Sequence, residues 1–187
     1  RGRQCQWRML TGTMLPNASV AVEPCDVKMQ REVQLAVEHE EAGLVHSAGA
    51  LADGLLVKQT QAGLQKVWGP KASAAWGFYS TAFSGASKWE MFVVFSSVSA
   101  LLGNPGQANY AAANACLDAL SRERQKQGLA GTSVQWGAWA GVGMAVASGV
   151  EEQLRGQGMG VVTEEQGVQA LELVLNGESA VVGVVPL

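Results

Sequence analysis

The stretch FVVFSSVSALLGNPGQANYAAANACLDAL, residues 92–120, decides the fold of this chain. The apolar run MFVVF, residues 91–95, is typical of a strand that is covered on both faces of a sheet. The GNPG sequence at 103–106 has the composition of a loop. A helix is predicted from about residue 107 to residue 126, with Gly128 ending it. A buried strand followed by a loop and a helix indicates an α/β protein.

Three polar residues stand at fixed places in this stretch. Ser97 follows the apolar run, Tyr110 opens the predicted helix, and Asn114 lies one helical turn later. A hydroxyl, a phenol and an amide placed in this way suit the reduction of a carbonyl group. Phenol is a poor acid, with a pKa of about 10, and needs a neighbouring cation to donate a proton well. Lys71 is the candidate cation, although each of these residues taken alone is more often a cap, a packing residue or a solvated lysine.

The rest of the chain alternates between strand and helix patterns. This alternation predicts a doubly wound parallel sheet with helices on both faces. Ligands of such sheets bind beyond the carboxyl ends of the strands, where Asp26, Gly49, Ser97 and Gly137 all fall. The further predicted strands are 19–24, 43–49, 132–136 and 180–185. The further predicted helices are 28–41, 150–158 and 164–175. Two more helices are predicted within 55–86, separated by a break at Gly69 and Pro70.

Composition excludes several classes of protein. The chain has 187 residues, of which 48% are hydrophobic and 16% charged, as expected for one globular domain. A net charge of −3 without a basic stripe argues against binding to nucleic acid or to anionic membranes. Its apolar runs are shorter than the roughly 18 residues of a transmembrane helix. The three cysteines lack CxxC spacing, which favours free thiols in a reducing cytoplasm over a metal site or a disulfide.

Five stretches carry a resemblance to a known family: CDV at 25–27, HSAGALADGLL at 46–56, GPKASAAW at 69–76, the stretch 92–120, and VQWGAWAGVGMA at 134–145. Over about residues 20–187 the sequence resembles the ketoreductase domain of a type I polyketide synthase. That domain is a Rossmann-like member of the short-chain dehydrogenase/reductase superfamily. The superfamily usually has Lys four residues after its Tyr, whereas Asn114 with Lys71 upstream is typical of the synthase ketoreductases. The ketoreductase of type I fatty acid synthase is similar over the same stretch.

The resemblance implies an NADPH-dependent reduction of a 3-ketoacyl chain tethered to an acyl carrier protein, beside neighbouring synthase domains. Tyr110 would give a proton to the ketone oxygen, and Ser97 would hydrogen-bond to that oxygen. Lys71 would lower the pKa of Tyr110 and hold the cofactor ribose, while Asn114 would maintain a polar relay. The product would be the 3-hydroxyacyl thioester. A non-catalytic structural subdomain of a synthase is the alternative from another class.

The resemblance also implies residues that contact cofactor and substrate. The cofactor-binding set comprises Asp26, Val27, Ala48, Gly49, Ser96, Lys71, Tyr110 and Gly137. The substrate pocket comprises Asp53, Leu102, Gln107, Trp139 and Met144, with residues 145–160 as a lid. His46 is expected to be structural, and the rings of Trp136 and Trp139 fit either a pocket floor or the core. An Asp at 53 with Leu rather than Trp at 102 favours a D-configured 3-hydroxyl, although Ala52 departs from the Leu-Asp-Asp pattern.

One part of the family pattern has no counterpart in this sequence. The family opens with a strand and a glycine-rich turn that cradles the cofactor pyrophosphate at a helix N-terminus. Only Gly2 and Gly12 occur early in this chain, with Arg1 or Arg3 as a possible contact to the 2′-phosphate. Residues 1–187 are therefore predicted to form an N-terminally truncated ketoreductase catalytic domain, without the first strand, turn, helix and second strand. Such a chain is expected to bind NADPH poorly by itself.

Overall fold

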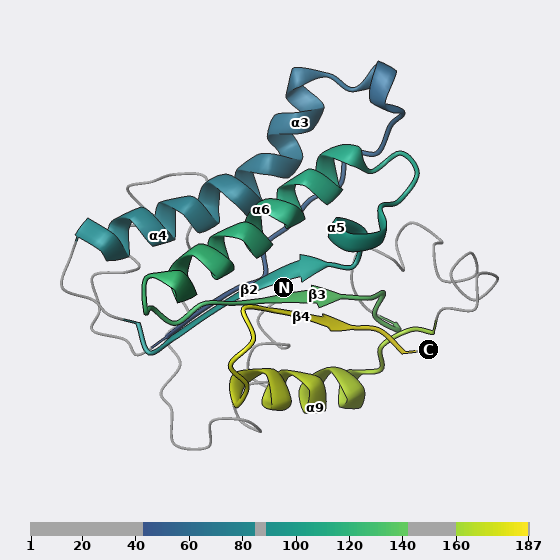
Figure 1. Ribbon diagram of the computed structural model, residues 1–187. Coiled ribbons are helices and arrows are strands. Elements are labelled where there is room, and N and C mark those ends of the chain that lie inside the picture. Colours follow the sequence, from purple (N-terminus) through teal and green to yellow (C-terminus); the bar gives the residue numbers. More distant parts are fainter. Residues whose placement is uncertain (1–42, 85–88, 142–159, 187) are drawn as a thin grey trace.

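A computed structural model describes residues 43–84, 89–141 and 160–186. Within this part of the chain, four strands form one sheet in the order β1-β2-β3-β4, and each neighbouring pair is parallel. The strands follow the same order in the sequence and lie side by side in Figure 1. The predicted α/β architecture is therefore confirmed. The four strands are β1 (Gly43–His46), β2 (Met91–Ser97), β3 (Thr132–Trp136) and β4 (Val181–Val184).

Helices cover both faces of this sheet, as the alternating pattern predicts (Figure 1). One face carries α3 (Gln61–Trp68), α4 (Ala74–Ser84) and α6 (Ala108–Lys126), and the other carries α9 (Glu164–Leu175). Helix α5 (Ser99–Leu102) was not predicted, and the 3₁₀ turn η1 (Leu56–Lys58) forms a separate short element inside the range 55–86 that was predicted to be helical.

Several predictions fall outside the described residues. These are the strand at 19–24, the helices at 28–41 and 150–158, the lid apart from Gly160, and the candidate residues Arg1, Arg3, Asp26, Val27 and Met144.

The α-helix is interrupted at Gly69 and Pro70, as predicted, but the interruption is helical instead of a loop. A single π-helical turn, η2 (Gly69–Ser73), joins α3 to α4, and the Ala74 N–H donates to the Gly69 carbonyl. Proline fits there because it lies in the first turn of η2, where its missing N–H costs least. The π turn inserts an extra residue per turn, a feature often found at functional sites, and it contains Lys71.

Strand β2 is longer than the apolar run that predicts it. It extends to Ser97 because Ser96 and Ser97 pair in register with Gln135 and Trp136 of β3. Ser97 is therefore the last residue of the strand instead of the residue after it. The carboxyl ends of β1, β2 and β3, at His46, Ser97 and Trp136, lie along one edge of the sheet, where the sequence predicts the site.

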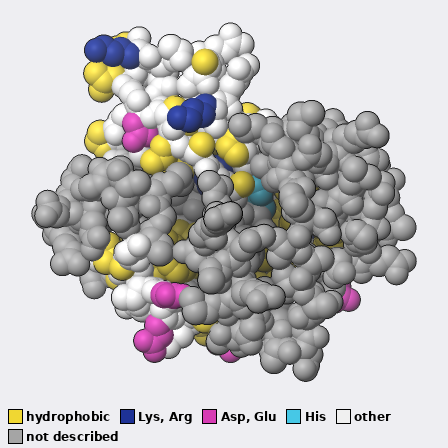
Figure 2. Space-filling model, turned by 180° about the vertical axis from the view of Figure 1, so that it is seen from behind, with side chains coloured by type: hydrophobic (Ala, Val, Ile, Leu, Met, Phe, Trp, Pro, Cys, Tyr) yellow, Lys and Arg dark blue, Asp and Glu magenta, His cyan; other side chains and the backbone are white. Residues whose placement is uncertain are grey.

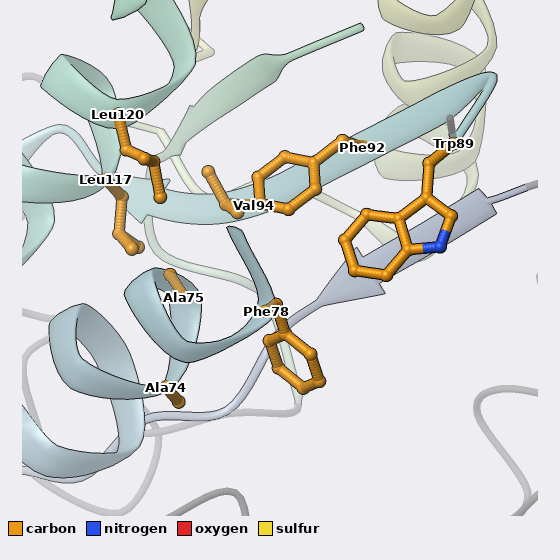
Figure 3. Packing of buried hydrophobic residues seen from close by; sticks show 8 residues of the cluster. All are labelled: Ala74, Ala75, Phe78, Trp89, Phe92, Val94, Leu117 and Leu120. Carbon is orange, nitrogen blue, oxygen red and sulfur yellow. The ribbon is translucent and has the colours of Figure 1, made fainter. Parts of the chain in front are cut away.

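Each face of the sheet has its own hydrophobic core. Figure 3 shows the first, in which the indole of Trp89 stacks on the ring of Phe92 at a centroid distance of 5.6 Å. Its buried members are Ala74, Ala75, Phe78, Trp89, Phe92, Val94, Leu117 and Leu120. The second core lies under α9 and consists of Val93, Val134, Trp136, Val162, Leu171 and Val174.

On the face seen in Figure 2, the basic side chains of the described residues lie in the upper part, over η1 and α3, together with an acidic side chain. Further acidic groups lie lower, mainly toward the bottom near α9. Glu164 and Glu165 open α9, where negative charge is favourable next to the helix N-terminus. No helix in the described ranges is both long enough and apolar enough to cross a bilayer.

We expect the core between α6 and β2 to dominate stability. Leu117 is 1% exposed on α6 and packs in the first core, so Leu117→Ala should lower the free energy of unfolding by about 2–5 kcal/mol. Leu173→Ala is the matched control, because Leu173 is 75% exposed on α9 and should change stability by about 0.5 kcal/mol or less. Urea unfolding measures both values. Equal losses in the two variants would contradict the placement of this core.

Candidate active site

Lys71 extends from the π turn η2 into the space between β2 and α6. Its Nζ donates a hydrogen bond to the Phe95 carbonyl at 2.8 Å and lies 5.3 Å from the centroid of the Tyr110 ring. The side chain is 3% exposed. Burial lowers the pKa of Lys71 to about 8, and the charge of Asp118 acts in the opposite direction. Lys71 is therefore still mainly a cation at neutral pH, in an environment that makes its charge costly.

Tyr110 and Asn114 lie one above the other on the buried face of α6. The Asn114 Nδ2 donates to the Tyr110 carbonyl at 2.9 Å. Asn114 is fully buried, and its Oδ1 has no hydrogen-bond partner among the described residues. An unsatisfied buried acceptor is costly and is uncommon in native proteins. This oxygen therefore marks a place where a hydrogen-bond donor of a ligand would fit.

The two serines at the end of β2 have different surroundings. The Ser96 hydroxyl is buried and donates to the Asn114 carbonyl at 3.2 Å, so it ties β2 to α6. The Ser97 Oγ accepts from the Ser99 N–H at 3.2 Å, at the start of α5. Ser97 remains partly exposed and can still donate its own proton. The structure thus makes Ser96 a structural link and leaves Ser97 facing the edge of the sheet.

The protonation of Tyr110 is controlled by burial. Burial raises the pKa of the phenol, and hydrogen bonding with the side chains of Asn114 and Ser97 opposes this increase. Asn114 and Ser97 are therefore the side chains that oppose the effect of burial on the pKa of Tyr110. The effect of Lys71 on this pKa, which the resemblance implies, stays a prediction; the Lys71 ammonium donates to the Phe95 carbonyl and lies near the Tyr110 ring. Tyr110 is accordingly fully protonated at neutral pH.

Two loops meet beside Tyr110 and bring together two of the predicted pocket residues, Asp53 and Gln107. The Gln107 Nε2 donates to Asp53 Oδ2 at 3.0 Å, and the Gly54 N–H donates to the Gly106 carbonyl at 2.8 Å. Leu102, at the end of α5, is 65% exposed. Gly106 has φ +76°, which suits glycine, and a side chain there would approach the backbone of Gly54. The loop around Asp53 is thus fixed to the loop that precedes α6.

Asn109 is a site residue that sequence reasoning missed. Its Nδ2 donates to the Ala52 carbonyl at 2.8 Å and to Gln59 Oε1 at 3.1 Å. Its Oδ1 accepts from the Tyr110 N–H at 2.8 Å. Asn109 therefore connects the loop that contains Asp53 directly to the backbone of Tyr110. Asn109 lies two residues after the N-cap Gln107, so no capping signal in the sequence points to it.

Trp139 is half-buried and packs against the second core, while its predicted place in the substrate pocket stays a prediction. Its ring lies 4.8 Å from that of Trp136 and packs directly over Gly167 of α9, where any side chain would collide with it. Trp139 also forms a bridge with Val162. The face covered by α9 is opposite the face that carries α6 and Tyr110 (Figure 1). Of the two alternatives for these tryptophans, the structure therefore favours the core.

The remaining predicted cofactor contacts lie at the same edge of the sheet. Ala48 and Gly49 follow β1, and Gly137 follows β3. The Gly137 N–H already donates to the Val184 carbonyl at 2.9 Å, so this amide supports β4. Among the described residues, no group of three or more His, Cys, Asp or Glu could hold a metal ion. Cys116 is a free thiol, and burial raises its pKa.

The comparisons with known proteins decide the family. The family model described as "KR domain" matches residues 6–141. The chain belongs to the KR domain family. KR domains are the ketoreductases of polyketide synthases and belong to the short-chain dehydrogenase/reductase superfamily, as the sequence motifs indicate. They reduce β-keto groups and use a nicotinamide cofactor.

Two curated relatives of the KR domain are large synthases. Polyketide synthase GfsE of Streptomyces halstedii is 39% identical over 172 residues, which are 86% of this chain and 4% of that protein. The 6-methylsalicylic acid synthase of Penicillium terrestre is 38% identical over 146 residues, which are 77% of this chain and 8% of that protein. The KR domain therefore spans a small fraction of the length of these relatives.

Solved structures agree with this assignment. An A-type ketoreductase from a modular polyketide synthase has a TM-score of 0.82 and 31% identity, over 90% of this chain and 36% of that chain. The first ketoreductase of the tylosin polyketide synthase has a TM-score of 0.76 and 35% identity, over 86% of this chain and 35% of that chain. The predicted Rossmann-like fold class is confirmed by these likenesses.

His46 is buried beside Lys71, and we expect it to control stability in acid. Burial, followed by the charge of Lys71, lowers the pKa of His46 to about 4. The unfolded chain binds a proton near pH 6.5, so between pH 6.5 and 4 it binds more protons than the folded chain. The free energy of unfolding should therefore fall by roughly 3 kcal/mol as the pH falls through this range.

The His46→Gln variant isolates this effect, because glutamine does not titrate. Urea unfolding at a series of pH values should give a shallower acid slope for His46→Gln than for the unmodified protein. Parallel slopes for the two proteins would show that His46 is charged or exposed in the folded state.

Proposed function

We propose that this KR domain is the catalytic part of an NADPH-dependent 3-ketoacyl-thioester reductase. Its substrate would be a 3-ketoacyl chain on an acyl carrier protein, and its product the 3-hydroxyacyl thioester, formed in cytoplasmic polyketide biosynthesis beside other synthase domains. One observation carries the proposal. Lys71, Ser97, Tyr110 and Asn114 come from three separate elements and converge at the carboxyl edge of β2, the place where parallel sheets bind ligands.

The polar groups at this edge fit the ribose of a nicotinamide cofactor. Lys71 has three N–H donors, and its hydrogen bond to the Phe95 carbonyl uses one of them. Asn114 Oδ1 offers an acceptor that is buried and unpaired within the described residues. Ribose hydroxyls both donate and accept hydrogen bonds, so they match this pair of groups. Lys71 and Tyr110 would hold the ribose, with the backbone of Ala48, Gly49 and Gly137 nearby.

The residues of the chain supply the proton side of the reduction. When bound, NADPH supplies a hydride to the carbonyl carbon of the substrate. Tyr110 gives its phenolic proton to the carbonyl oxygen, which becomes the hydroxyl of the product. The Ser97 hydroxyl donates a hydrogen bond to the same oxygen, so two donors stabilise the negative charge that develops on it. The raised pKa of Tyr110 keeps the phenol in the protonated form that this step requires.

Lys71 acts after the proton has left Tyr110. The phenolate would carry a negative charge in a buried place, where an unpaired charge is costly. The Lys71 ammonium, 5.3 Å from the centroid of the ring, offsets that charge. A proton relay through the polar groups around Asn114 would then restore the phenol. The retained set of four polar residues favours this catalytic function over the alternative of a purely structural subdomain.

The Tyr110→Phe variant tests the proton donor. We expect it to lower kcat by about 10²–10⁴, the usual contribution of general acid catalysis. NADPH oxidation with a 3-ketoacyl thioester surrogate, at saturating NADPH, measures the rate. Tyr79→Phe is the matched control: the Tyr79 hydroxyl donates to Gln127 Oε1 at 3.0 Å at an exposed position, so its loss should leave kcat unchanged.

Equal rates for Tyr110→Phe and the unmodified protein would remove Tyr110 from the chemistry. Absence of turnover in the unmodified protein, under conditions in which fluorescence shows NADPH to be bound, would favour the structural alternative.

The configuration of the product tests the substrate pocket. Asp53 is held by Gln107 at the approach to Tyr110, and residue 102 is Leu, so we expect a D-configured 3-hydroxyl. Asp53→Ala should reduce the excess of the D product, because the fixed carboxylate no longer limits the approach of the substrate. Chiral chromatography of the reduced surrogate measures both ratios. An L product from the unmodified protein would contradict the expectation.

A further inference from the structure

Asp118 is a buried carboxylate on the helix that carries the site, and the proposed mechanism makes no use of it. It lies one turn after Asn114 and two turns after Tyr110, so the three side chains share one face of α6. Asp118 is 3% exposed. A carboxylate is rarely buried to this extent unless its oxygens are hydrogen-bonded or paired with a cation.

Both oxygens of Asp118 accept short hydrogen bonds from strand β3. The Ser133 hydroxyl donates to Oδ1 at 2.6 Å, and the Gln135 Nε2 donates to Oδ2 at 2.7 Å. Ser133 and Gln135 are two positions apart, so both side chains point to the same face of the sheet. A carboxyl group that only accepts hydrogen bonds, and at these distances, has the pattern of a charged carboxylate. These bonds fix α6 to β3 at a defined position along the strand.

The charge of Asp118 also acts on Lys71. The titratable groups that influence or face Lys71 in the described structure are His46 from β1, and Tyr110 and Asp118 from α6. His46 is neutral near pH 7, because its pKa is lowered to about 4. Tyr110 is neutral as well, because its pKa is raised. Asp118 is the group whose negative charge raises the pKa of Lys71 against the effect of burial.

We propose that Asp118 is a positioning residue of the reductase site, which anchors α6 to β3 and supports the buried ammonium of Lys71 through its negative charge. The proposal rests on the reductase function proposed above, and it assigns to Asp118 no contact with substrate or cofactor. Its two effects reinforce each other. The hydrogen bonds from Ser133 and Gln135 hold the Asp118 carboxylate in one place. Because its position is fixed, its electrostatic interaction with Lys71 stays the same.

The Asp118→Asn variant removes the charge and keeps the shape of the side chain. The Asn oxygen can still accept from Gln135, and the Ser133 hydroxyl can rotate to accept from the new amide. Ser133→Ala is the first control, because it removes one of the two hydrogen bonds and keeps the charge. Glu172→Gln is the second control, because it removes an exposed negative charge from α9 on the opposite face of the sheet.

The direct readout is the titration of Lys71 by nuclear magnetic resonance. The ¹³Cε signal of Lys71 in protein labelled with [¹³C]lysine reports its protonation, and the Lys71→Arg variant assigns the signal. We expect an inflection near pH 8 in the unmodified protein and in both controls. In Asp118→Asn the inflection should move to lower pH by about one unit, the size expected when one nearby charge is lost in a protein interior.

The second readout is the pH profile of kcat/KM, which reports groups of the free enzyme. Because Lys71 is needed as a cation, activity should fall as the pH rises through its pKa, and Asp118→Asn should shift this alkaline limb to lower pH. Ser133→Ala should leave the limb in place even if the rate falls. If Asp118→Asn does not fold, Asp118→Leu, an apolar residue of similar size, takes its place in both measurements.

The outcomes separate this proposal from the proposed function. A shifted Lys71 inflection with a shifted alkaline limb supports both. An unchanged inflection in Asp118→Asn overturns the proposal, because Asp118 is then only a structural anchor, and turnover by the unmodified protein would leave the reductase function standing. A shifted inflection in a protein that binds NADPH but shows no turnover overturns the reductase function and the positioning role of Asp118. Only the electrostatic effect of Asp118 on Lys71 then remains.

Discussion

The structure depends on the burial of a polar helix face against a parallel sheet. Helix α6 points Tyr110, Asn114 and Asp118 toward β2 and β3, where water cannot satisfy their polar groups. The hydroxyls of Ser96 and Ser133 and the amide of Gln135 provide protein partners, so the strands must carry polar side chains in the middle of an apolar sheet. Burying polar side chains costs free energy, so an apolar face would pack a helix without a chemical function at lower cost. We therefore regard it as the part of the fold that is shaped by the reaction.

The cation of this face comes from a different element. Lys71 reaches the site from a π turn, which rotates its side chain inward while Pro70 and Ala72 remain buried beside it. Burial lowers the pKa of Lys71 to about 8, close to neutral pH. The groups around Lys71 therefore determine which fraction of it is protonated. The neutral state of His46 and the negative charge of Asp118 both favour the ammonium. Proton transfer from Tyr110 thus depends on the packing of β1, η2, α6 and β3. A change in any of these elements should alter the rate of the proton transfer.

The sequence predicts elements best where local signals and burial agree. The strand at 132–136 and the helix at 164–175 match the structure to the residue, the latter because Thr163 and Gln166 form a capping box. The π turn is not predictable in this way, since Gly69 and Pro70 normally indicate a break. The position of Ser97 within β2 depends on its register with β3, and the packing of Trp139 depends on the absence of a side chain at Gly167 of a distant helix. These features depend on contacts between residues that are distant in the sequence, so no local sequence pattern predicts them. Spacing and the family resemblance predict the four catalytic candidates, whereas only the hydrogen bonds in the structure identify Asn109 and Asp118.

The most direct test of this account is the transfer of deuterium from NADPH to substrate. The protein would be incubated with NADPH that carries deuterium at both hydrogens of C4 of the nicotinamide and with a 3-ketoacyl thioester, and the product analysed by mass spectrometry. The account predicts a 3-hydroxyacyl thioester with one deuterium on C3, because the hydride comes from the cofactor and the hydroxyl proton comes from Tyr110 and exchanges with solvent. A product without deuterium on C3, or NADPH consumed without a 3-hydroxyacyl product, would contradict the claim that this polar helix face serves carbonyl reduction.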